Sequence, residues 1–264
     1  MASRTKQKEE ARARRLEQER ARAEQTRRNR RLRMVGGVVL GAVIVVAIAI
    51  AVSSGGSSGG GSGLQTGTKS SQTVTQVNSL LSGIPQSGAT LGNPNAKVTV
   101  DYYGDLECPI CRDFTLNGGW PQLVANEVRQ GKVKVVYRAF QTATPSPQTF
   151  QTQQIAALAA GKQDKFWNFM ELFYHEQGTE DTSYVTESYL TSLAQQAGVN
   201  LSTWNTDRKD PALLAQVESD GQSGNSIGVQ GTPTLVFFGP KGSTSPSAGV
   251  PSYSDLQSAI SKVS

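Results

Sequence analysis

The chain's only two cysteines, Cys108 and Cys111, lie in the stretch E-C-P-I-C-R with two residues between them. A structural zinc site needs four nitrogen or sulfur ligands, and the sequence offers only one further candidate of that kind, its single histidine, His175. An inert structural disulfide is the second reading, but a loop this short removes little chain entropy and therefore stabilises little. We favour the third reading, a redox centre that alternates between disulfide and dithiol.

The position of Pro109 places the two thiols at the start of a helix. Proline is tolerated in the first helical turn, because the N–H that it lacks would have no intrahelical partner there. The N-terminus of a helix carries partial positive charge, which favours the thiolate of Cys108 over its thiol. Cys111, one turn further along, is then expected to be the more buried thiol that resolves a mixed disulfide.

Strands and helices around the cysteine pair predict an α/β domain over residues 74–264. KVTVDYY (97–103) and KVKVVYRAF (132–140) are rich in β-branched and aromatic residues and are typical of strands, and TPTLVFF (232–238) is a third. The helix that starts at the cysteine pair is expected to break near Asn117-Gly118-Gly119 and to end at Gly131. Further helices are predicted over 73–84, 148–175, 186–199, 211–228 and 253–263. Helices that interrupt a small sheet define the α/β class.

The N-terminal tail, residues 1–33, differs in composition from the rest of the chain. It holds 13 Lys+Arg and 5 Asp+Glu, a net charge of 13 − 5 = +8, whereas the remainder carries 13 − 16 = −3. The basic character therefore belongs to the tail and indicates no nucleic-acid surface on the folded part. We interpret the tail as a mobile topology signal, with RNA or lipid binding as the alternative.

An uncharged apolar run, MVGGVVLGAVIVVAIAIAV (34–52), follows the tail. As a helix it is about 30 Å long, which matches the hydrocarbon core of a bilayer. The positive charge before it predicts a cytoplasmic N-terminus and an extracytoplasmic location for residues 53–264. A cleaved signal peptide is the alternative, although the run is longer than the usual apolar region of such a peptide. The Gly/Ser-rich residues 53–73 are expected to form a flexible linker.

Two segments carry a resemblance to a known family. VDYYGDLECPICRDF resembles the active-site segment of the DsbA family of thioredoxin-fold oxidoreductases, in particular its membrane-anchored bacterial branch. GVQGTPTLVFF resembles the family's second signature, in which a Thr-Pro bond, here Thr232-Pro233, is cis and packs against the disulfide. The long interval between these segments resembles the helical insertion of that family, at about 145–228. The resemblance covers roughly residues 74–264.

This resemblance implies a thiol–disulfide oxidoreductase that forms disulfides in secreted or cell-envelope proteins. It implies protein or peptide thiol substrates, no metal or organic cofactor, and re-oxidation by a quinone-linked membrane partner. Two alternatives stay open: a reductase or isomerase of the same fold, and a non-catalytic tethered binding module. The family motifs assign Cys108 and Cys111 as catalytic residues, with Asp105, Pro109, Ile110, Thr232 and Pro233 as active-site support.

Two positions depart from the family pattern. Members often carry a carboxylate six residues before the first cysteine, where this chain has Tyr102. The neighbouring Asp101 is expected to point to the opposite side of the strand and not to take over that role. Ile110 stands where many members have histidine, and isoleucine cannot stabilise a thiolate. We therefore expect a centre that is less strongly oxidising than one with histidine at this position.

Three further polar residues lie in or near the predicted site. Asp105 matches an acidic position common in this branch, and it is equally well explained as a turn residue that caps local backbone. Glu107 would disfavour the thiolate of Cys108 if it were close and ionised, but we interpret it as a solvated loop charge. His175 is expected to be a partly exposed helix residue. The three tryptophans are expected to belong to the core: Trp120, Trp167 and Trp204.

Overall fold

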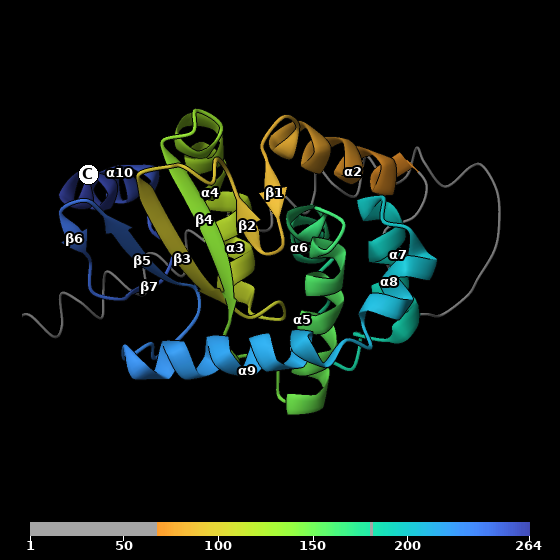
Figure 1. Ribbon diagram of the computed structural model, residues 1–264. Coiled ribbons are helices and arrows are strands. Elements are labelled where there is room, and N and C mark those ends of the chain that lie inside the picture. Colours follow the sequence, from red (N-terminus) through yellow and green to blue (C-terminus); the bar gives the residue numbers. More distant parts are fainter. Residues whose placement is uncertain (1–67, 180–181) are drawn as a thin grey trace, which may run out of the picture. The chain divides into compact units, whose positions relative to one another are not determined.

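The computed structural model of the chain describes residues 68–264 apart from 180–181 (Figure 1). The predicted tail, the predicted membrane span and most of the predicted linker lie outside these residues. None of the helices in the described part has the length and apolar character that a membrane span requires. Helix α2 (Thr68–Leu81) begins inside the predicted linker 53–73. The buried side chain of Thr73 explains this earlier start, because it packs with the domain.

A mixed sheet forms the centre of the domain, with the strand order β1-β2-β4-β3-β5-β6 and with β7 also paired to β5. Strands β3 and β4 are parallel, and β5 is antiparallel to β3. The three predicted strands are confirmed as the long ones, whereas the short bridging strands were not predicted. The strands are β1 (Gln86–Ser87), β2 (Thr90–Leu91), β3 (Val98–Gly104), β4 (Val133–Ala139), β5 (Thr234–Gly239), β6 (Gly242–Ser243) and β7 (Ser247–Ala248).

The helix after the cysteine pair breaks at Gly118–Gly119, as predicted. A Cβ on Gly119 would lie 2.8 Å from backbone atoms of Ser252 and Tyr253, so only glycine fits where the C-terminal helix begins. The segments after β3 are α3 (Pro109–Asn117), α4 (Trp120–Leu123) and the π-helix η1 (Val124–Val128). The helix after β7 is α10 (Tyr253–Val263), which matches its predicted range.

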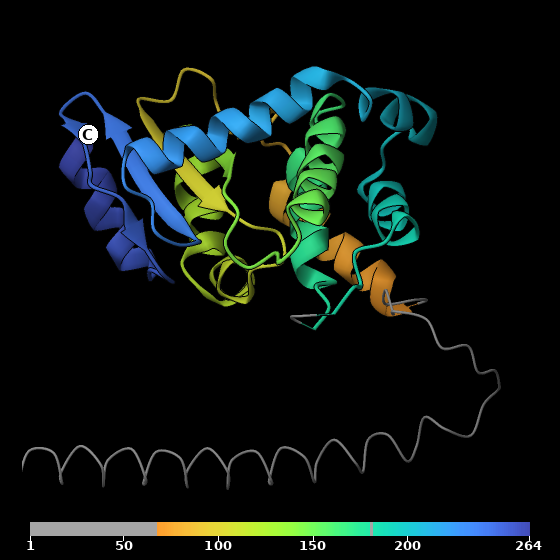
Figure 2. The ribbon, with the colours of Figure 1, turned by 90° about the horizontal axis from the view of Figure 1, so that it is seen from below.

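A block of helices lies between β4 and β5 in the chain, within the range predicted for the insertion (Figures 1 and 2). The short helix α8 was not predicted, because its seven residues are too few to show an apolar period. The helices are α5 (Pro147–Gly161), α6 (Phe166–His175), α7 (Glu187–Ala197), α8 (Leu201–Asp207) and α9 (Pro211–Ser226).

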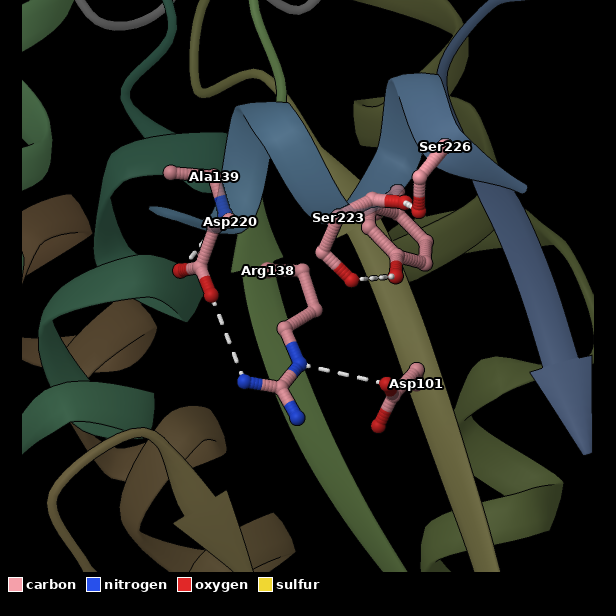
Figure 3. A network of polar contacts seen from close by, with 7 residues as sticks. Asp101, Arg138, Ala139, Asp220, Ser223 and Ser226 are labelled. Atoms are coloured by element: carbon pink, nitrogen blue, oxygen red, sulfur yellow. Dashed lines mark hydrogen bonds and ion pairs between the residues drawn. The ribbon is translucent and has the colours of Figure 1, made fainter. Parts of the chain in front are cut away.

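Alternate residues of β3 serve the two faces of the sheet. Tyr102 faces the aromatic core, where its ring packs edge-on to Phe114 of α3 at 5.5 Å. Asp101 faces the other side and bonds to Arg138, which confirms the predicted orientation (Figure 3). All three tryptophans are fully buried, as expected, and Trp120 stacks on Trp167 with ring centroids 5.1 Å apart.

Helix α9 is held on the second face of the sheet by an ionic network that Figure 3 shows. Arg138 lies between two buried carboxylates, with contacts of 3.2 Å to Asp101 and 3.2 Å to Asp220. The second carboxylate oxygen of Asp220 accepts the backbone N–H of Ala139. One guanidinium group thus joins β3, β4 and α9.

Candidate active site

The two cysteines lie where β3 leads into α3, and both are free thiols. Cys108 is the N-cap residue of α3, with Pro109 in the first turn as predicted. The backbone N–H of Cys111 donates to the sulfur of Cys108 at 3.3 Å. Cys108 is 4% exposed and Cys111 is fully buried, which agrees with the expectation that Cys111 is the more buried thiol.

The pKa values of the two thiols are displaced in opposite directions. The pKa of Cys108 is lowered to about 6, chiefly by a hydrogen bond with the Cys111 side chain, with help from Thr232 and from backbone N–H groups and against the effect of burial. Burial raises the pKa of Cys111 well above its ordinary value, and the neighbouring Cys108 raises it further. At neutral pH the reduced pair therefore holds one thiolate, at Cys108, and one thiol, at Cys111.

The loop before β5 brings Thr232 and Pro233 against the cysteine pair. The Thr232-Pro233 bond is cis, as the resemblance implied. When Cys108 is protonated, its thiol donates to the Thr232 carbonyl oxygen at 3.3 Å, and the Thr232 hydroxyl bonds to that of Thr142. Ile110, two residues after Cys108, is 49% exposed, so an apolar side chain faces solvent near the reactive cysteine in the chain.

Asp105 is fully buried and joins the cysteine loop to the turn after β4. One of its oxygens accepts the backbone N–H groups of Thr142, Ala143 and Thr144, each at 2.9 Å. The other accepts the backbone N–H of Glu107 at 3.1 Å and the Thr144 hydroxyl at 2.5 Å. These contacts match the reading of Asp105 as a backbone cap. The closeness of the 142–144 turn to Asp105 could have been predicted from the sequence. The two segments follow the parallel strands β3 and β4, and the carboxyl ends of parallel strands meet at one edge of a sheet.

A buried cluster of hydroxyl groups surrounds Tyr102, whose hydroxyl feels the charge of Cys111. Tyr102 is fully buried, and its hydroxyl lies 3.4 Å from that of Thr115 and 3.5 Å from that of Tyr174. The Tyr174 hydroxyl donates to the backbone carbonyl of Asp105 at 3.3 Å. At the position where the family often has a carboxylate, this chain therefore presents the Tyr102 hydroxyl.

Gln177 contacts the cysteine loop, and sequence reasoning missed it. Its side-chain amide donates to the backbone carbonyls of Leu106 at 2.7 Å and Cys108 at 3.2 Å. Nothing in the local sequence signals this role, because the contact depends on how the insertion folds over the loop. His175 is half-buried, in agreement with its prediction, and burial lowers its pKa with help from the charge of Arg112.

The interpretation of Glu107 as a solvated loop charge is wrong. Its side chain is only 8% exposed, and its Oε1 atom has no hydrogen-bond partner within the described part of the chain. Burial raises the pKa of this carboxyl group to about 7, and the charge of Asp105 raises it further, while the Thr144 side chain acts in the opposite direction. The adjacent insertion removes Glu107 from water, which a reading of the loop alone could not show.

Comparisons with known proteins agree with this architecture. A sequence model described as thioredoxin matches residues 86–261. Disulfide bond formation protein D of Bacillus subtilis is 27% identical over 168 residues, 61% of this chain and 72% of that protein. The crystal structure of oxidised BdbD from Bacillus subtilis has a TM-score of 0.56 at 23% identity, covering 69% of this chain and 96% of that one. The Wolbachia pipientis alpha-DsbA1 structure has a TM-score of 0.56 at 18% identity, covering 69% and 92%. At these identities the two structures show the likeness of fold.

Proposed function

Because this chain belongs to the thioredoxin family, as a DsbA-like thiol–disulfide oxidoreductase, we propose that Cys108 and Cys111 are its redox centre and that it forms disulfides in proteins outside the cytoplasm. The observation that carries this proposal is the opposed pKa displacement of two thiols at one helix start, where the Cys111 backbone N–H donates to the Cys108 sulfur. A low thiol pKa makes Cys108 a good leaving group, so the oxidised pair transfers its disulfide readily. The relative's name, disulfide bond formation protein D, supports the same direction.

The reaction proceeds in two thiol–disulfide exchanges. A substrate thiolate attacks the sulfur of Cys108, which breaks the Cys108–Cys111 bond and leaves the Cys111 sulfur to take up a proton. A second substrate thiolate then attacks the substrate's own sulfur in the mixed disulfide. The Cys108 thiolate leaves, the substrate keeps a disulfide, and two electrons remain on the enzyme as a dithiol. The pair needs no metal or organic cofactor for these steps.

The substrate chain approaches between Thr232 and Ile110. The Thr232 carbonyl is an accepting group 3.3 Å from the reactive sulfur, and an extended peptide recognises such backbone groups at an exposed edge. Ile110, 49% exposed, adds an apolar contact without a charge requirement. This combination suits protein thiols in varied sequence contexts.

The location of the domain follows from the N-terminal segments. Residues 34–52 anchor the protein as a single span, with residues 1–33 in the cytoplasm and the domain outside. The asymmetry of Lys and Arg supports this orientation. The anchor contacts the lipid bilayer and keeps the domain near a quinone-linked membrane partner that re-oxidises the dithiol. No nucleic acid is a partner, because the folded part carries no excess of basic residues.

The reduction potential separates disulfide formation from the alternative, a reductase or isomerase. The full-length chain is equilibrated against glutathione buffers, and the free thiols are counted by alkylation. A potential more oxidising than about −180 mV supports disulfide formation, whereas one near or below about −230 mV supports the reductase. Cys108→Ala is the control. Full cellular function in that variant would restore the second alternative, a binding module with a vestigial cysteine pair.

A further inference from the structure

We infer that Gln177 is a positioning residue of this redox centre: its side-chain amide, supplied by the insertion, fixes the backbone of the cysteine loop (residues 105–108), so that the Cys108 sulfur remains in contact with the first N–H groups of α3. The inference rests on the proposed function of Cys108 and Cys111. It deepens that function, because it gives the insertion a part in setting the reactivity of the cysteine pair. The family resemblance assigned Gln177 no role.

A single nitrogen atom of Gln177 bridges two backbone carbonyl groups. Its Nε2 donates to the Leu106 oxygen at 2.7 Å and to the Cys108 oxygen at 3.2 Å, and a primary amide has one hydrogen for each. Leu106 is fully buried, so its carbonyl group is removed from water and depends on donors from the protein. The bridge therefore restrains the peptide groups that precede Glu107 and follow Cys108.

The backbone conformation of Cys108, the N-cap residue of α3, decides where its sulfur lies. Its φ of −70° and ψ of 117° are extended, which is the conformation in which an N-cap side chain turns back onto the N–H groups of the first turn. The sulfur there accepts the Cys111 N–H at 3.3 Å. The Cys108 carbonyl oxygen accepts two donors, the Arg112 N–H at 3.1 Å and the Gln177 amide at 3.2 Å. Two bonds to one carbonyl group hold ψ of Cys108, and with it the position of the sulfur.

The insertion holds the backbone of Gln177 on both sides. The carbonyl of the preceding residue, Glu176, accepts the Tyr189 hydroxyl at 3.1 Å. The following residue, Gly178, lies so close to Tyr184 that a Cβ there would be 2.5 Å from the ring. The two tyrosine rings pack edge-on to each other with centroids 5.3 Å apart. A well-packed part of the insertion therefore carries the amide that holds the cysteine loop.

Gln177→Met removes this bridge without changing a charge. Methionine is close to glutamine in size and has no N–H to donate. The titratable and charged groups of the elements around the cysteine pair stay the same in the variant. These groups are Tyr102 on β3, Asp105 and Glu107 on the cysteine loop, Arg112 on α3, Tyr137 on β4, and Tyr174 and His175 on α6. A change in the ionisation of Cys108 therefore reports the position of its sulfur relative to the donors.

The ionisation of Cys108 measures how well the sulfur is held. Several hydrogen bonds share the lowering of its pKa from the ordinary value of 9.0 to about 6. In Gln177→Met these bonds lengthen, so the midpoint of iodoacetamide alkylation should rise by about one pH unit. Against glutathione the variant should then be about tenfold less oxidising at pH 8, which is about 30 mV, and within about twofold of wild type at pH 5.5. The difference nearly vanishes at pH 5.5 because Cys108 is then mostly protonated in both proteins.

The experiment uses the full-length chain in detergent, with alkylation rates from pH 4.5 to 9 and glutathione equilibria at pH 5.5 and 8. Gln163→Met is the matched control. The Gln163 amide also holds a loop of the insertion, with bonds of 2.8 Å and 3.2 Å to the backbone of Asn200, but it precedes α6 whereas Gln177 follows that helix. This control should keep the wild-type midpoint and equilibrium. Gln177→Asn keeps the amide on a side chain that is one methylene shorter, so it should behave like Gln177→Met.

Three results overturn the inference. The first is an alkylation midpoint in Gln177→Met that equals wild type. The second is an equal loss of oxidising strength at pH 5.5 and pH 8, which would mark a general effect on the fold and not the position of the sulfur. The third is a Gln163→Met variant that moves as far as Gln177→Met. If the methionine variant at position 177 fails to fold, Gln177→Asn decides by the same criteria.

Failure of the proposed function is distinguishable from failure of this inference. In the first case no reversible Cys108–Cys111 disulfide forms in the wild-type protein at any pH. The alkylation midpoints of wild type and Gln177→Met still test the inference then, because they are measured on the reduced protein and need no disulfide.

Discussion

At the scale of single residues, the site shows how identical or similar groups acquire different properties from their surroundings. Cys108 and Cys111 are one helical turn apart, yet their pKa values move in opposite directions, because one sulfur accepts hydrogen bonds and the other is fully buried. Asp105 and Glu107 are both buried carboxyl groups two residues apart, but only Asp105 has a full set of donors. Residue type alone does not distinguish the members of either pair.

Alkylation of the reduced protein tests the asymmetry of the thiols. Iodoacetamide should react with Cys108 alone, with a rate that rises with pH through a midpoint near 6, because the thiolate is the reactive form and the pKa of Cys108 is lowered to about 6. In Cys111→Ala the midpoint should move to higher pH, since the Cys111 side chain is the largest cause of the lowering. An unchanged midpoint in that variant would contradict the assigned cause.

Glu171 provides a second test at this scale. It is 1% exposed in α6, accepts a hydrogen bond from the Trp120 indole at 2.5 Å, and has a pKa raised by burial to about 8 from an ordinary value of 4.5. Because this carboxyl group holds its proton more tightly in the folded state, the folded protein loses stability as pH rises from about 4.5 to about 8. Glu171→Gln keeps the acceptor and cannot ionise. The variant should therefore match wild type near pH 5 and exceed it at pH 8, by on the order of 2–4 kcal/mol.

Urea unfolding at pH 5, 6.5 and 8 measures this difference in the free energy of unfolding for Glu171→Gln. Parallel pH profiles for variant and wild type would show that Glu171 is ionised in the folded state.

At the scale of elements, α9 is the helix that ties the insertion to the sheet. The Arg138 guanidinium bridges Asp101 and Asp220 (Figure 3), and the Ser223 hydroxyl lies 3.2 Å from that of Tyr103. Burial raises the pKa of both carboxyl groups, and Arg138 acts to lower them. The arginine therefore offsets part of the effect of burial on these two carboxyl groups at the contact between α9 and the sheet.

Arg138→Met should destabilise the protein by about 2–3 kcal/mol at pH 7.5, less than for a fully buried network because Arg138 is partly exposed. Without the cation, the folded-state pKa values of Asp101 and Asp220 rise further. The folded variant then binds these protons more tightly than the unfolded chain does, so its free energy of unfolding falls as pH increases. The loss should thus be smaller at pH 5 than at pH 7.5. Urea unfolding at both values measures it. Lys162→Met, which breaks an exposed ion pair, is the control and should shift the urea midpoint little. Equal losses at the two pH values would contradict the argument.

At the scale of the whole molecule, the central strands and longer helices could be predicted, because each carries an apolar period over several residues. The cysteine pair and Thr232-Pro233 could be assigned from family motifs. The burial of Glu107 and the contact from Gln177 could not, since both depend on how the insertion lies over the cysteine loop. The strands of two residues and the helix α8 are too short to have a period. Residues 1–67 lie outside the description, so the anchor and tail stay predictions.

The N-terminal boundary of the domain gives a test at this scale. Helix α2 starts at Thr68, Thr73 is buried, and the Ser70 hydroxyl donates to Gln196 of α7 at 3.0 Å. A fragment of residues 66–264 should therefore be more stable than one of residues 74–264, by about 1–2 kcal/mol, because the shorter fragment loses these contacts and the first turns of α2. Thermal unfolding followed by circular dichroism measures the difference. Equal midpoints would place the functional boundary at Val74.

The attachment of α9 also sets where this protein can be recombined with its relatives. Helix α9 packs on β4 and on α5, and the chain runs from its end at Ser226 directly into the loop that carries Thr232. A Cβ on Gly224 would lie 2.6 Å from the ring of Phe140, so α9 fits closely against the residue that follows β4. A chimera that exchanges residues 147–210 leaves this fit intact. One that also exchanges 211–226 replaces that fit as well, and either chimera must retain Tyr174 and Gln177, because both bond to the cysteine loop.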